Sequence, residues 1–63
     1  MLKLVCKSII KKYAKEHLKE FRKAKIAKRY ENYLVFVGDK HHFHFSYEKF
    51  KYKLIKITEI VYF

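Results

Sequence analysis

Proline and tryptophan are absent from this 63-residue chain, and glycine and cysteine each occur once. Because Cys6 has no partner, no disulfide can form within the chain, which favours a reducing compartment over secretion. No apolar run approaches the roughly 20 residues that cross a bilayer. The apolar start is also too short before its first lysines to form the core of a signal peptide. We therefore expect a cytoplasmic protein without a membrane partner.

Acidic residues are also scarce, and the excess positive charge is concentrated in one half of the chain. Six Asp and Glu face sixteen Lys and Arg, so the formal net charge is +10. Residues 1–30 hold nine Lys and two Arg against two Glu, a net charge of +9, whereas residues 31–63 carry only +1. Abundant Lys, Ile, Tyr and Phe have AT-rich codons and suit a phage, viral or mobile-element gene. Such a coding bias would raise lysine throughout and does not explain the asymmetry.

The basic half has the pattern of an amphipathic helix. No Gly or Pro interrupts residues 7–29, and at 100° per residue the apolar side chains gather on one side. The opposite side is cationic. The apolar stripe drifts after Ala24, so we expect a helix over about Ser8 to Ala27 that ends or bends before Tyr30. The cationic side chains are Lys11, Lys12, Lys15, Lys19, Arg22, Lys23 and Arg29.

The second half alternates with a period of two, which is typical of strands. Tyr33–Val37 is an apolar, β-branched run, and Lys40–Tyr47 alternates aromatic with polar residues. Gly38-Asp39 between them predicts a two-residue type II′ hairpin turn. We expect the next turn at Glu48-Lys49. The extended segment over 50–63 changes phase at Leu54-Ile55, which predicts a bulge, a bend or two short strands there.

These elements predict one α+β domain over residues 1–63. A basic helix within residues 1–30 would pack on one face of a three-stranded antiparallel meander within residues 33–63, in the order αβββ. A chain of this length buries only about 60% of its unfolded surface, so a dimer is also considered.

The cationic helix face favours a small, non-catalytic protein that binds nucleic acid. A stripe of seven Lys and Arg can follow a phosphate backbone and gain affinity by counterion release. Only two of the sixteen cations are Arg, which argues against reading guanines through bidentate contacts. We therefore expect DNA or RNA binding without sequence preference. The plainer alternative is that the face is only solvated surface.

Twelve Tyr and Phe exceed what so small a core hides easily. Exposed tyrosines interleaved with Lys51, Lys53 and Lys56 could stack on unpaired bases. Most of the aromatics are instead expected to form the core or a dimer interface. An exposed aromatic sheet edge also supports a second hypothesis, in which a phage or mobile-element protein binds and inhibits a host protein.

Three histidines follow the predicted hairpin turn. His42 and His44 would point the same way on a strand and fill two corners of a metal site. The available further ligands (Cys6, His17, Asp39 and Glu48) follow no known spacing, so we expect no metal and no cofactor. The hairpin histidines could alternatively act as acid and base in a toxin-type ribonuclease, a third hypothesis. The favoured interpretation leaves them as polar residues of the exposed sheet face, with no catalytic residue.

Overall fold

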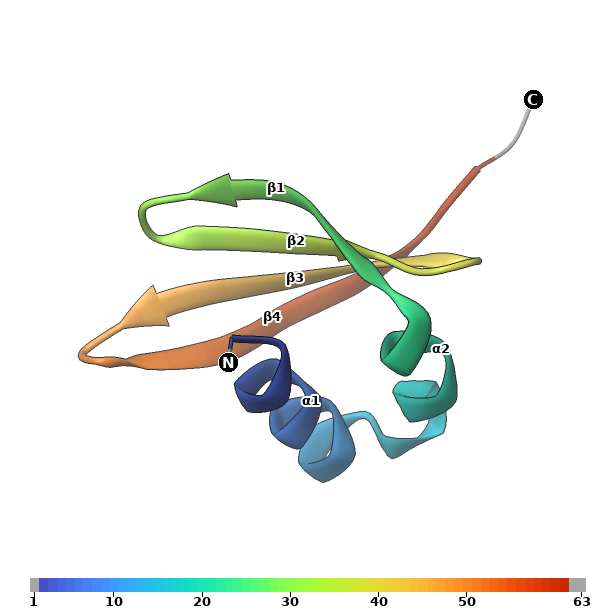
Figure 1. Cartoon of the computed structure of the whole chain (residues 1–63), viewed down its shortest axis with the longest axis horizontal. Coiled ribbons are helices and arrows are strands. Elements are labelled where there is room, and N and C mark those ends of the chain that lie inside the picture. The colour runs from blue at the N-terminus through green and yellow to red at the C-terminus, as the bar shows by residue number, and fades with distance from the viewer. Residues whose placement is uncertain (1, 62–63) are drawn as a thin grey trace.

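The chain opens with two short helices and continues as an antiparallel sheet in the computed structural model, which describes residues 2–61 (Figure 1). The elements are α1 Leu2–Tyr13, the 3-10 turn η1 Lys15–His17, α2 Leu18–Lys23, β1 Lys25–Tyr30, β2 Tyr33–Val37, β3 His41–Glu48 and β4 Lys51–Glu59. The sheet order is β1-β2-β3-β4. The predicted α+β class with an N-terminal helix on an antiparallel sheet is confirmed, but the sheet has four strands, not three. The last two predicted strand residues, Tyr62 and Phe63, lie outside the described part.

The expected continuous helix is wrong because the chain turns at Ala14. Its φ of −144° and ψ of 51° are not helical, and α2 folds back beside α1 (Figure 1). A straight helix would have carried Phe21 past the sheet, whereas the turn leaves that side chain fully buried. Burying a Phe contributes about 1.5–3 kcal/mol, more than the few tenths that most single residues contribute through helix propensity. Tertiary packing therefore overrides the uninterrupted helical pattern.

The last residues of the predicted helix, Lys25 to Ala27, instead begin strand β1. Ala24 leaves helical geometry at φ −70° and ψ 150°, and β1 then pairs with β2 from Lys25↔Val37 to Tyr30↔Tyr33. A register shift between Ile26 and Lys28 marks a bulge. Pairing satisfies the backbone groups along one edge of β2, which would otherwise end the sheet as an apolar, unpaired strand. This edge is the physical reason for the fourth strand.

The predicted hairpin between β2 and β3 forms, with its loop displaced by one residue. The Gly38 N–H donates to the His41 carbonyl at 2.9 Å, which leaves Asp39 and Lys40 as the loop. Gly38 has no positive φ, so the type II′ turn is not formed. A Cβ at position 38 would lie 2.5 Å from the Glu20 carboxylate oxygen Oε2. Glycine is therefore required here for close approach to α2.

The hairpin between β3 and β4 turns at Lys49-Phe50, one residue later than expected. Both residues have positive φ, 49° and 66°, the pattern of a type I′ turn without its usual Asn or Gly. Phe50 is 93% exposed at the tip. The predicted phase slip is confirmed, because the register shifts where Phe45 pairs with Leu54 and His44 with Lys56, leaving Ile55 as the extra residue.

The core lies between the helices and one face of the sheet. The Phe21 ring is 5.0 Å from Phe36 and 5.1 Å from Phe43, centroid to centroid. Cys6 is a fully buried residue of this core, and burial raises the pKa of its thiol to about 11. The buried set is Cys6, Ile10, Ala14, Phe21, Ala24, Leu34, Phe36, Phe43 and Phe45. Among residues 2–61, no helix has both the length and the apolar composition needed to cross a bilayer.

Candidate nucleic-acid interface and histidine cluster

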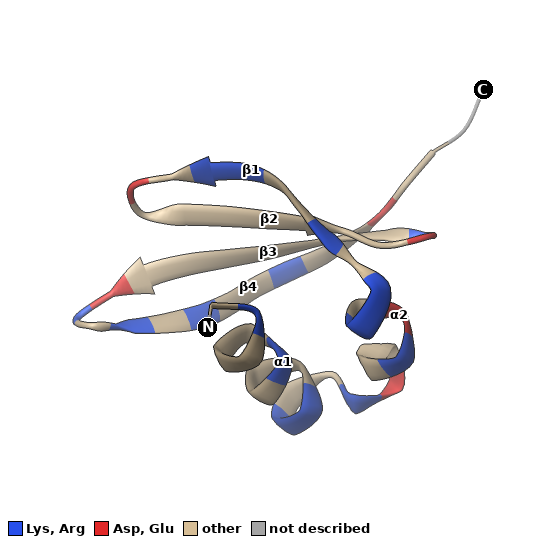
Figure 2. Cartoon of the chain, viewed as in Figure 1, with Lys and Arg blue, Asp and Glu red and all other residues tan. Residues whose placement is uncertain are grey.

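The seven predicted phosphate-binding cations are all exposed, but they do not share one helix face. Figure 2 shows the basic residues distributed over the helices, β1 and β4, and none on β2 or β3. The turn at Ala14 separates the cations of α1 from those of α2. Lys11 and Lys12 lie in the last turn of α1, and Lys15 lies in η1. Lys19, Arg22 and Lys23 lie on α2, and Arg29 lies on β1. Within the described chain, none of the seven forms an ion pair with a carboxylate.

The sheet face turned away from the helices carries a second basic surface, which we call the open face. Directly paired residues share a face of the sheet, so the register defines rows across all four strands. Both helices pack on the opposite side, and no helix or strand of residues 2–61 covers these rows (Figure 1). The rows are Lys28–Val35–His44–Lys56, Tyr30–Tyr33–Ser46–Lys53 and Lys25–Val37–His42–Thr58.

The open face has cationic margins and a mixed floor, with Tyr33, Val35 and Val37 on β2 and His42, His44 and Ser46 on β3. Four lysines of the rows form the margins, about 14 Å apart at the usual strand spacing, and we call them the margin lysines: Lys25 and Lys28 on β1, and Lys53 and Lys56 on β4. These three rows contain no acidic residue, and the next pair on the same face is Glu48 with Lys51. The nearest carboxylate contact is Glu48 with Lys53, a loose 3.9 Å pair between two exposed side chains. Such exposed pairs contribute little, so the positive charge of the margins is largely uncompensated.

Hydrogen bonds hold the centre of this floor in place. The Tyr33 hydroxyl lies 2.6 Å from His44 Nδ1, and His44 Nε2 lies 3.1 Å from the Thr58 hydroxyl oxygen. Burial, together with the nearby charges of Lys56 and His42, lowers the pKa of His44. A neutral imidazole suits this position, since it can accept from one hydroxyl and donate to the other. Tyr30 is 63% exposed beside this network and presents a free aromatic surface.

Protein-family models, curated proteins and solved structures contain no match to this chain. The function is therefore argued from the residues and their arrangement.

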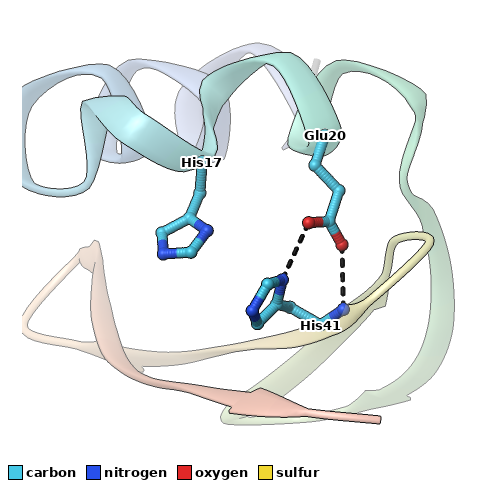
Figure 3. Close-up of side chains that lie close together, drawn as sticks. All are labelled: His17, Glu20 and His41. Atoms are coloured by element: carbon cyan, nitrogen blue, oxygen red, sulfur yellow. Dashed lines mark hydrogen bonds and ion pairs between the residues drawn. The ribbon is translucent and has the colours of Figure 1, made fainter.

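A separate cluster of His17, Glu20 and His41 lies on the helix side of the sheet (Figure 3). Glu20 Oε2 accepts hydrogen bonds from the backbone N–H groups of Lys40 and His41, each at 2.8 Å, while Oε1 lies 2.8 Å from His41 Nδ1. Burial of Glu20 opposes ionisation, but these hydrogen bonds outweigh it and lower the carboxyl pKa. Glu20 thus joins α2 to the hairpin loop as a carboxylate.

The sequence pattern pointed to other histidines. His42 and His44 do share a face, the open one, with ring centroids 6.2 Å apart. His41 points to the opposite side, where its ring centroid is 4.7 Å from that of His17. Glu20 was missed because a lone Glu three residues after a His is a weak signal without the hairpin that meets it.

Proposed function

We propose that this protein is a small, non-catalytic nucleic-acid-binding protein that holds a single strand on the open face of its sheet. The observation that carries the proposal is the lysine margin on each edge of a floor that holds Tyr33, with Tyr30 exposed beside it. Margin lysines can contact phosphates while unpaired bases stack on the tyrosines. The cations of α1, α2 and β1 add to the attraction for a polyanion. The buried, unpaired Cys6 is compatible with a reducing cytoplasm as the place of action.

A single strand fits this surface better than a duplex. Stacking on aromatic side chains is available only to unpaired bases and contributes about 1–3 kcal/mol per base. Tyr30 and Tyr33 are paired residues of β1 and β2, which puts two tyrosine side chains on this face. Arginine is absent from its rows, so no bidentate arginine contact to guanine is available there. We therefore expect binding to DNA and RNA strands with little sequence preference.

Fluorescence anisotropy with a labelled single strand tests the proposal. If the four margin lysines each meet a phosphate, the log-log salt slope has a contribution of about −3, at about −0.7 per contact. A fourfold rise in salt then weakens binding about 50-fold through these contacts alone. Replacing all four margin lysines with Gln should remove this part of the slope. The set is Lys25, Lys28, Lys53 and Lys56.

A charge-matched variant separates the two basic surfaces. Replacing four helix-side cations with Gln removes the same charge and leaves the open face intact, and we expect a smaller loss of slope. A larger loss in this variant would instead place the phosphate contacts on the helices. Absence of binding in low salt to single strands and duplex alike would reject the nucleic-acid function and favour a host-protein partner. The helix-side set is Lys15, Lys19, Arg22 and Lys23.

A further inference from the structure

We propose that His17, Glu20 and His41 bind a divalent transition-metal ion, with Zn²⁺ as the best-fitting ion. Each residue offers one donor atom, and these atoms all lie within 4.8 Å of one another. Figure 3 shows the two imidazole rings and the carboxylate turned toward a common space between η1, α2 and the start of β3. This inference does not depend on nucleic-acid binding, since the cluster and the open face lie on opposite sides of the sheet.

The spacing requires a modest adjustment to hold an ion. In a tetrahedral site with zinc about 2.0–2.2 Å from its nitrogen and oxygen ligands, two donors lie about 3.3–3.6 Å apart. The widest separation allowed here, 4.8 Å, therefore has to close by no more than about 1.5 Å. The His41 and Glu20 atoms, 2.8 Å apart, have to separate by about 0.5–0.8 Å. Rotation of the His17 side chain supplies most of the adjustment, because no hydrogen bond restrains its ring among the described contacts.

The carboxylate is preorganised for this role. Its second oxygen is fixed by two backbone N–H groups, and the absence of a Cβ at Gly38 allows the close approach. Oε1 therefore remains aimed at His41 Nδ1 and the common space. Because Glu20 is ionised, Nδ1 carries the proton in the metal-free protein. On binding, the ion replaces that proton between Nδ1 and Oε1, and the neutral imidazole carries its proton on Nε2.

The ligand types select the class of ion. Two imidazoles and one carboxylate, with an open position for solvent, form a three-ligand zinc site. Ca²⁺ requires six or more oxygen ligands, and Mg²⁺ prefers oxygen ligands and keeps several waters, so a single carboxylate is a poor site for either. The Glu20 and His41 side chains are 17% and 20% exposed, so the site is sheltered while solvent retains access. Three lysines line the adjoining hollow together with Glu16, Glu20 and Asp39, and the carboxylates offset their repulsion of a cation.

Titration of the chelator-treated full chain with Zn²⁺, read by competition with a chromogenic chelator, tests the site. We expect one equivalent to bind and to raise the melting temperature, with no response to Mg²⁺ or Ca²⁺. Co²⁺ in place of Zn²⁺ should give the visible absorption of a four-coordinate ion. His17→Gln is the decisive variant, since it removes a ligand without breaking a hydrogen bond of the fold, and it should weaken zinc at least tenfold.

Matched variants on the open face provide the control. His42→Gln with His44→Gln removes the same number of imidazoles from the other side of the sheet and should leave zinc affinity unchanged. Circular dichroism confirms that each variant is folded. The site is rejected if the wild-type chain shows no zinc binding or if His17→Gln binds as tightly as wild type. It is also rejected if the affinity is lost only with His42 and His44.

Discussion

Replacing Gly38 with Ala should destabilise the fold only while Glu20 is present. The new Cβ would lie 2.5 Å from Glu20 Oε2 and 2.8 Å from its Cγ, so the carboxylate must move. Its movement breaks two backbone hydrogen bonds and the contact to His41, all at 2.8 Å. Hydrogen bonds to a charged group contribute about 1.5–3 kcal/mol each, but the displaced carboxylate regains water. We therefore expect a loss of about 2–3 kcal/mol, or a fall of about 10–20 °C in melting temperature.

In the Glu20→Ala background, Gly38→Ala should stabilise the protein instead of destabilising it. Gly38 has no positive φ, so Ala can adopt its backbone conformation, and Glu20→Ala removes the three atoms nearest to the new Cβ. The substitution then restricts the unfolded chain and stabilises the protein by about 0.4–1 kcal/mol. Urea unfolding of the two single variants and the double variant measures this coupling. An equal cost of Gly38→Ala in both backgrounds would refute close approach to Glu20 as the reason for this glycine.

Three other predictions concern stability and reactivity. Lys49→Asn with Phe50→Gly should raise the free energy of unfolding by about 1–2 kcal/mol, since both residues occupy the left-handed region; unchanged urea midpoints would contradict this. Because the His44 pKa is lowered on folding from 6.5, only the unfolded chain gains a proton just below that pH, so stability should fall on acidification. The fall in melting temperature on acidification should therefore be smaller for His44→Gln than for the wild-type protein. Cys6 should resist thiol reagents in the native protein and react in denaturant, and rapid native labelling would show that the core opens.

The local sequence pattern predicted strands β2 to β4, but it did not predict structure that depends on contacts between distant segments. Alternation along β3 predicted both its faces, and the phase slip beside Leu54 predicted the β4 bulge. Lys25–Tyr30 contains good helix formers, so propensity favoured helix. Its strand conformation depends on the unpaired edge of β2, a tertiary feature that a helical projection does not contain.

The same limit applies to the two candidate sites, the open face and the histidine cluster. The alternation placed His42 and His44 on one face, and the pairing register added Lys25, Lys28 and the β4 lysines to it. The cluster of His17, Glu20 and His41 spans more than 20 residues of sequence and depends on how α2 meets a hairpin loop. Spacing rules search within a segment and could not find it.

Because the margin lysines lie on the edge strands, they also affect self-association. β1 and β4 end the described sheet, and each leaves backbone N–H and C=O groups that another chain could pair with. Lysines on both edges oppose this, because joining two copies edge to edge would bring like charges together. Charge-neutralising substitutions therefore remove a barrier to fibrous assembly as well as a phosphate contact. A polyanion that neutralises these edges would relax the same barrier, so concentration and light scattering must be controlled whenever the protein is mixed with one.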